Sequence, residues 1–171
     1  MLLWQFWIYS FLGYLLEKAF AKATRAPQQG RKCFLLLPLC PVYGLGMLAV
    51  LALPAGWRES AWLIVWGGLA AAFVEYGVHW AYETFLHVRF WDYAQVWGNL
   101  HGRVCLPFTL IWGVLTAAAV WWVQPWVETL AGRVPWEITW LCLLVFTADA
   151  LVSARFLWVT GDVERLRADR A

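Results

Sequence analysis

Three titratable side chains recur one helical turn apart in an apolar segment of the chain. Glu75, His79 and Glu83 occupy positions i, i+4 and i+8, which lie along one face of an α-helix. A charged group at the centre of a membrane span costs about 2.5–3.5 kcal/mol on insertion scales, so such groups face a cavity or a partner. The stripe therefore indicates either a substrate or proton site, or a contact in which Arg, Tyr or Trp side chains of neighbouring helices pair with the carboxylates.

Metal binding is the weakest interpretation of this stripe. Di-metal helical bundles combine Glu-x-x-His pairs from two helices, and no second helix with Glu and His together is visible. The four cysteines, at positions 33, 40, 105 and 142, show no Cys-x-x-Cys spacing, and three fall near the predicted cytoplasmic side, where thiols stay reduced. We therefore expect no metal site, with Glu75, His79 and Glu83 as weak candidates only, and neither a disulfide nor a zinc framework.

A second polar group lies in the stretch "RFWDYAQVWGNLHGRVCLP" at 89–107. Asp92, Asn99 and Arg103 come close to the point where the segment that ends near Glu83 must meet the next apolar run. An arginine beside carboxylates forms bidentate pairs and can also hold a phosphate or carboxylate ligand. The alternative is an interfacial helix or re-entrant loop whose aromatic side chains lie at the level of the lipid headgroups. Those aromatic residues are Phe90, Trp91, Tyr93 and Trp97.

The composition determines the class of protein that must position these groups. The chain is 63% hydrophobic and 14% charged over 171 residues and contains 15 Trp, whereas an ordinary soluble domain is about 25% charged. A helix needs about 20 apolar residues to cross the hydrocarbon core. We therefore predict an all-α, polytopic bundle of about five transmembrane spans in one integral-membrane domain at 1–171, embedded in a lipid bilayer and without a soluble domain.

The five spans are expected at about 2–22, 34–53, 61–85, 104–124 and 136–160, followed by a cytoplasmic tail at 161–171. In the second span, Pro38, Pro41, Gly44 and Gly46 should interrupt regular helical hydrogen bonding near its start. We expect the chain from Pro41 onward to open its backbone near the cytoplasmic side, where a cavity or neighbouring side chains must satisfy the exposed groups.

Lysine and arginine in the short loops predict the orientation, because they favour the cytoplasmic side. The first and third connections and the tail are basic, whereas the second and fourth connections hold one basic residue each. This pattern predicts a protein of the bacterial cytoplasmic membrane whose N-terminus lies outside the cell and whose C-terminus lies in the cytoplasm. The tryptophans gather at the predicted outer ends, as in an interfacial aromatic belt. The apolar N-terminal run lacks a basic n-region, so we do not expect a cleaved signal peptide.

Several blocks of the sequence together resemble the ABC-transporter type IV family of small integral-membrane proteins. The blocks are "YSFLGYLLE", "LLLPLCPVYGLG", the Glu75 and Glu83 pair, "FWDY", "NLHGRVCL" and "WG". The resemblance runs from about Tyr9 to Pro125 and departs from the family pattern at Pro38, at the histidines and at Ala94. It implies a shared polar core and a permease role. The core consists of Glu17, Pro41, Tyr43, Gly44, Glu75, Glu83, Trp91, Asp92, Tyr93, Asn99, Gly102 and Arg103.

Three functions remain open at this point. A permease or permease-like subunit would need a separate ATPase subunit or ion coupling, because the chain has no Gly-x4-Gly-Lys-Ser/Thr loop, and it would need homo- or hetero-oligomerisation to enclose a pathway. An intramembrane enzyme or binding protein for a lipid or lipid-linked phosphate would use Glu or Asp as base and Arg103 as phosphate clamp, although no hydrolase or transferase motif supports an enzyme. A non-catalytic assembly subunit is the third. None of them calls for a cofactor or nucleic acid.

The topology also predicts how the polar residues meet. Arg103 should pair with at least one of Glu83, Asp92 and Glu75, since all belong to segments that end on the same side. Glu17 should approach this cluster from the first span, and one acid should remain outside the arginine pairing, available to a ligand or a proton.

Overall fold

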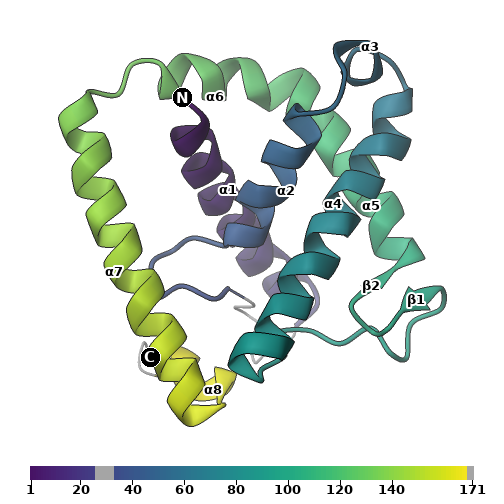
Figure 1. Ribbon diagram of the computed structural model, residues 1–171. Helices are drawn as coiled ribbons and strands as arrows, with labels where there is room; N and C mark the ends of the chain where they lie inside the picture. Colours follow the sequence, from purple (N-terminus) through teal and green to yellow (C-terminus); the bar gives the residue numbers. More distant parts are fainter. Residues whose placement is uncertain (26–32, 169–171) are drawn as a thin grey trace.

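The computed structural model describes residues 1–25 and 33–168. Its long helices alternate in direction, so that the N-terminus and the last helix lie at opposite ends of the molecule (Figure 1). These helices are α1 (Leu2–Ala23), α2 (Pro41–Leu51), α4 (Trp62–Ala81), α5 (Leu106–Ala118) and α7 (Trp136–Thr160). Shorter elements are α3 (Ala55–Arg58), α6 (Gln124–Ala131), α8 (Val163–Ala168) and the hairpin of β1 (Asn99–Leu100) and β2 (Val104–Cys105). Arg31, Lys32 and Arg170 of the predicted basic segments lie outside the described residues.

The all-α, multi-pass character of the chain is confirmed in its coarse form. Three segments are long and apolar enough to cross a membrane: Trp62–Leu86, Leu106–Ala131 and Trp136–Thr160. The 11 residues of α2 extend over only about 16 Å at 1.5 Å per residue, about half of a hydrocarbon core of roughly 30 Å. The count of five spans and their orientation therefore stay predictions.

The second predicted span is helical only in its C-terminal part. Helix α2 begins at Pro41, and the preceding residues 33–40 form an irregular segment. Proline suits the first turn of a helix because it has no N–H to leave unsatisfied there. The predicted break thus exists, but it precedes Pro41, and "VYGLG" is regular helix. Helix α7 provides hydrogen-bond acceptors for backbone N–H groups of this irregular segment. The Asp149 carboxylate accepts hydrogen bonds from the amides of Leu36 and Leu37, at 3.1 and 2.8 Å.

The same segment overturns the expectation that no disulfide forms. Cys33 and Cys40 are joined by a disulfide, and both residues are buried. The bends of 34–38 bring the two ends of the segment together, although seven positions separate the cysteines in sequence. Spacing alone did not predict this contact, because the turn of the backbone depends on the partners in α7. Cys105 and Cys142 are free thiols.

The fourth predicted span continues into a helix that changes direction. Helix α5 passes through a π-helical turn, η3 (Ala119–Val123), into α6, which runs across the end of the bundle near the N-terminus (Figure 1). Pro125 in the first turn of α6 cannot donate a helical hydrogen bond to the preceding turn, which explains a bend there. The stretch at 125–135, expected as a loop, is therefore mostly helix. A second π-helical turn, η2 (Tyr82–Leu86), ends α4.

Glycines let the central helices approach closely. A Cβ at Gly113 of α5 would overlap the backbone carbonyl of Ile64 in α4, and a Cβ at Gly68 would lie 2.6 Å from the carbonyl oxygen of Thr109. Between α1 and α2, a Cβ at Gly44 would overlap the Ser10 side chain. Small residues at such contacts are typical of helix association in membranes, where packing replaces the hydrophobic effect. This packing fixes the rotation of the four helices that carry the polar residues.

Candidate functional site

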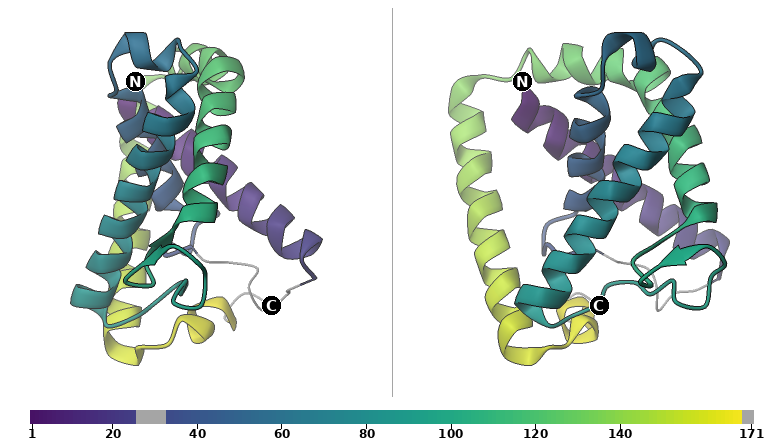
Figure 2. Two further views of the ribbon diagram at one scale, coloured as in Figure 1. Left: turned by 90° about the vertical axis from the view of Figure 1, so that its right-hand side faces the viewer. Right: turned by 45° about the vertical axis from the view of Figure 1, so that its right-hand side comes forward.

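The helices α1, α2, α4 and α5 enclose a cavity of about 380 Å³. Figure 2 shows α1 running diagonally past α2 and α4, so that the helices are splayed rather than parallel. The volume falls in the usual range for a small-molecule site, about 300–1,000 Å³. Its walls are mainly aliphatic and aromatic, and Glu17 and Glu75 are the only charged side chains among the described residues that line it.

Each of these two carboxylates is oriented by aromatic hydrogen-bond donors. The Tyr43 hydroxyl donates to Oε1 of Glu17 at 2.7 Å. Glu75 accepts hydrogen bonds from the Tyr93 hydroxyl at 3.1 Å and from Nε1 of Trp112 at 3.0 Å. All five side chains line the cavity. They come from α1, α2, α4, α5 and the 87–98 loop, so the site depends on the packing of the whole bundle.

The loop residue Tyr93 reaches into the cavity from the end of the bundle. Its ring stacks on Phe108 with 5.0 Å between the ring centroids. Burial, together with the nearby Glu75 carboxylate, raises the pKa of Tyr93 well above the usual tyrosine range. The phenol thus stays protonated at every pH that the protein experiences, and it remains a donor to Glu75.

Exposed lining residues on α1 and on the α5–η3 segment indicate that the cavity opens between these elements. Four lining residues on these helices are exposed: Leu12, Leu16, Leu115 and Trp122. All four are apolar, and α5 belongs to a candidate membrane span.

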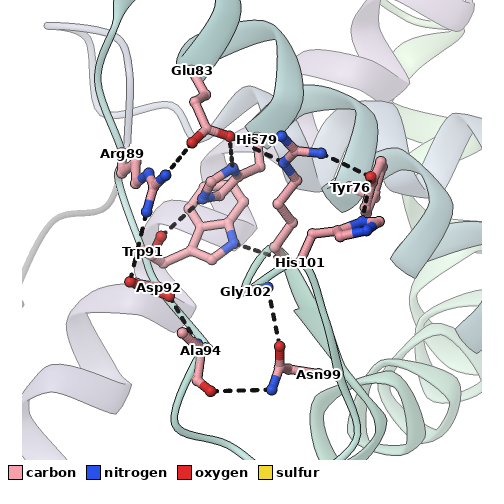
Figure 3. Close-up of polar contacts among 11 residues, drawn as sticks. Tyr76, His79, Glu83, Arg89, Trp91, Asp92, Ala94, Asn99, His101 and Gly102 are labelled. Atoms are coloured by element: carbon pink, nitrogen blue, oxygen red, sulfur yellow. Dashed lines mark hydrogen bonds and ion pairs between the residues drawn. The ribbon is translucent and has the colours of Figure 1, made fainter.

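A second polar network lies at the end of α4 and in the loop that follows (Figure 3). Arg103 donates to Oε2 of Glu83 from Nε at 3.1 Å and from a terminal nitrogen at 2.8 Å. Arg89 contacts the other oxygen of Glu83. The Glu83 carboxylate, as hydrogen-bond partner, raises the pKa of Arg103 above its usual value. These charged side chains lie outside the cavity, and their pairs connect the end of α4 to the loop that follows.

Tyr76 and His101 extend the network along α4. The other terminal nitrogen of Arg103 donates to the Tyr76 hydroxyl at 2.7 Å, and this hydroxyl lies 2.9 Å from Nδ1 of His101. Arg103 is thereby held on two sides, which favours a structural role.

Asp92, Asn99 and Gly102 shape the loop itself. Asp92 accepts a hydrogen bond from the backbone N–H of Ala94 at 2.8 Å. The Asn99 side chain donates hydrogen bonds to the carbonyl oxygens of Ala94 and Val96, and it accepts one from the backbone N–H of Gly102. Gly102 has φ +70°, a conformation that glycine adopts without steric cost. These predicted site residues hold the backbone turns and do not line the cavity.

His79 lies between the two groups on the same face of α4. It is 3% exposed, and its Nε2 lies 2.9 Å from the carbonyl oxygen of Trp91, which identifies Nε2 as the protonated nitrogen. Its Nδ1 has no hydrogen-bond partner within residues 1–25 and 33–168, and it lies 3.9 Å from Oε2 of Glu83. Among residues 1–25 and 33–168, no group of three His, Cys, Asp or Glu side chains is placed to hold a metal ion.

The predicted cluster is thus divided between two places. The pairing of Arg103 with a carboxylate is confirmed, but the partner is Glu83, and Asp92 instead lies 3.9 Å from Arg89. Glu17 lines the same cavity as Glu75 and does not join the arginine pair. Three of the four aromatic rings expected at headgroup level, those of Phe90, Trp91 and Tyr93, are buried, whereas Trp97 is 75% exposed.

Trp112 is the cavity residue that the sequence analysis did not select as a site residue. It belongs to the "WG" block, and its indole N–H is the second donor to Glu75. Tyr9 also lines the cavity, and its hydroxyl donates to Gln124 at 2.7 Å. The position of Trp112 next to Gly113, a glycine at a close helix contact, could have identified it as a cavity residue. The chain contains 15 Trp, however, so one tryptophan did not stand out in the sequence.

The fold and cavity define a multi-pass helical membrane protein with two carboxylates in an apolar cavity. Residues 4–154 match the family model described as "Putative ABC-transporter type IV", and the chain belongs to that family. The match extends the resemblance in both directions, from 9–125 to 4–154. No curated protein and no solved structure matches the chain significantly.

Proposed function

We propose that the protein is a permease-like subunit of the cytoplasmic membrane that binds a small, largely apolar molecule in the cavity between α1, α2, α4 and α5. The cavity itself carries this proposal, because it combines a volume of about 380 Å³ with a few oriented polar groups at its wall. Family membership supports a role in a transport system. A separate ATPase subunit would supply the energy.

The two other functions find less support in the same geometry. A lipid-phosphate site was expected to use Arg103 as its clamp, but Arg103 is bound to Glu83 and Tyr76 and does not line the cavity. A purely structural subunit would be expected to fill its interior with side chains, since protein cores are close-packed. The acid-bearing cavity therefore favours a ligand.

The experiment tests this proposal by placing a larger side chain in the wall of the cavity, so that less space remains for a ligand. Gly46 lines the cavity, and a Cβ placed on it would meet no atom within 4 Å. Gly77 in α4 has the same open surroundings but does not line the cavity. The variants Gly46→Leu and Gly77→Leu thus make a matched pair, in which both replace a helical glycine that has space for a side chain.

Binding is measured with the neutral apolar dye N-phenyl-1-naphthylamine on the purified full-length chain in detergent, through energy transfer from tryptophan to the dye. Wild type and Gly77→Leu should show saturable transfer, and Gly46→Leu should weaken it at least tenfold. Equal binding by all three proteins, or no saturable binding by wild type, would contradict the proposed function.

A further inference from the structure

We propose that the C-terminal end of α7 and the residue that follows η2 bind the phosphate headgroup of an anionic membrane lipid. The site consists of Arg155 and Trp158 on α7 and of His87, which directly follows η2. None of these three residues lines the cavity between α1, α2, α4 and α5. The lipid site is therefore separate from the proposed ligand site and does not depend on it.

Arg155 lies on the face of α7 that is turned away from the other helices. The face toward the bundle includes Ser153 and Leu157, which are both 0% exposed. At 3.6 residues per turn, Arg155 lies about 160° around the helix from each of them. Leu151 and Val159, one turn before and one turn after Arg155, are exposed. The other helices thus leave this side of α7 uncovered.

A charged side chain on such a face needs a counter-charge from outside the chain. Helix α7 is a candidate membrane span, and Arg155 is exposed. Within the described ranges, Arg155 forms no hydrogen bond and no ion pair. It precedes Thr160, the last residue of α7, by about 7.5 Å at 1.5 Å per residue. Long arginine side chains near the end of a span extend to the level of the headgroups, where lipid phosphates supply negative charge.

Two exposed rings next to Arg155 add hydrogen-bond donors to the same surface. Trp158 follows Arg155 by three positions and is therefore its neighbour on the helix surface. The ring of His87 lies 6.4 Å from the ring of Trp158, measured between centroids. Figure 1 shows the last turns of α7 beside the end of α4, where η2 contacts α7. In the described part of the chain, no hydrogen bond engages the indole N–H of Trp158 or the imidazole of His87.

A phosphate group matches this set of donors. The planar guanidinium of Arg155 can bind two phosphate oxygens at once, and imidazole and indole N–H groups can donate to a further oxygen. A lipid brings its phosphate to the depth that the arginine reaches, while its acyl chains pack on Leu151 and the apolar residues around it. An anionic headgroup fits better than phosphatidylcholine, because the choline group carries a positive charge that opposes that of the arginine.

The test measures lipid binding to the purified full-length chain by native mass spectrometry. Phosphatidylglycerol and phosphatidylcholine with identical acyl chains are each added to the delipidated protein in uncharged detergent. Wild type should bind phosphatidylglycerol about tenfold more tightly, as expected for one charge-assisted pair. Arg155→Gln should reduce this preference to about twofold or less, and Arg155→Lys, which keeps the charge but lacks the planar fork, should lie between them. His87→Ala should reduce the preference by about threefold, because it removes one donor.

The matched control is Arg133→Gln. Arg133 is exposed in the loop before α7, so this variant removes the same charge from the opposite end of the helix and should behave as wild type. Equal affinity of wild type for the two lipids would overturn the proposal. A preference that Arg155→Gln leaves unchanged, or that Arg133→Gln lowers as much, would overturn it as well, because the net charge or another surface would then be responsible.

A competition experiment separates a lipid from a soluble phosphate ester. Glycerol phosphate shares the phosphate group of phosphatidylglycerol but has no acyl chains. In large excess it should leave the bound phosphatidylglycerol in place. Displacement of the lipid by glycerol phosphate would overturn the assignment to a lipid and would identify a soluble phosphate ester as the ligand.

Discussion

Replacing Asp149 by alanine is expected to release the irregular segment 33–40 from α7. The carboxylate accepts the amide N–H groups of Leu36 and Leu37 at 3.1 and 2.8 Å, and Ser153 accepts the Leu36 amide at 3.3 Å. Within an apolar bundle these N–H groups have no equivalent replacement from water. The segment leads directly into α2, so its position also sets the position of Tyr43.

The size of the effect follows from the hydrogen bonds lost. A hydrogen bond to a charged group contributes about 1.5–3 kcal/mol, and a bond between neutral groups about 0.5–1.5 kcal/mol. We expect Asp149→Ala to reduce the free energy of unfolding by about 3 kcal/mol. Asp149→Asn keeps one acceptor and should lose about half as much, and Ser153→Ala should lose about 1 kcal/mol. For a chain of this length, 3 kcal/mol corresponds to a Tm lower by about 6–12 °C.

The assay is thermal unfolding of the purified variants in one detergent. Glu137→Ala, on the same helix but exposed, controls for the loss of a carboxylate from α7 and should leave Tm unchanged. The order of Tm values should be Glu137→Ala, Ser153→Ala, Asp149→Asn and Asp149→Ala, from highest to lowest. An Asp149→Ala protein as stable as the Glu137→Ala control would refute the reasoning that this carboxylate holds the segment.

Further predictions concern the polar network, the helix contacts, the cysteines and the topology. In thermal unfolding, Arg103→Ala and Glu83→Gln should be non-additive, with the double variant losing less than the sum, because either change alone breaks the same pair. Arg103→Ala and Asp92→Asn should add, since no contact joins them, and coupling as large as that with Glu83 would contradict the network. Gly113→Ala should cost about 1–3 kcal/mol through overpacking, whereas Gly77→Ala should be neutral or stabilising. Maleimide labelling of the denatured, unreduced chain should detect two thiols, and detection of four would exclude the disulfide. A reporter fused to the C-terminus should be active only in the cytoplasm, and activity on the opposite side would overturn the predicted orientation.

The sequence predicted best those elements that depend on local pattern. The range predicted for the fifth span, 136–160, coincides with α7 (Trp136–Thr160), and 2–22 lies within one residue of α1, because uninterrupted apolar runs specify a helix without reference to neighbours. The break in the second span was predicted, but it precedes Pro41 instead of following it, and α6 was not predicted. Prolines marked both places, but a proline can begin a helix as well as end one, and only the partners of the chain decide between these outcomes.

Pairing at a shared end of the bundle was also predictable, as Arg103 and Glu83 show. Both residues lie at the ends of segments that must meet, so their chain positions sufficed. The residues of the loop, by contrast, were all expected at one site, and the structure divides them between backbone turns and cavity lining. Asn99 and Asp92 differ from Tyr93 in the direction of the side chain, which a loop sequence does not specify.

The sequence by itself determined the membrane class, most helix ranges, and the acidic face of α4, because composition and the 3.6-residue period act locally. Only the tertiary structure decided that Glu17 and Glu75 line one cavity, that Trp112 donates to Glu75, and that Asp149 binds the segment before α2. These contacts join residues 26 or more positions apart in the chain. They depend on the rotation and tilt of each helix, which are set by the close contacts at Gly44, Gly68 and Gly113, and such packing is a property of several segments at once.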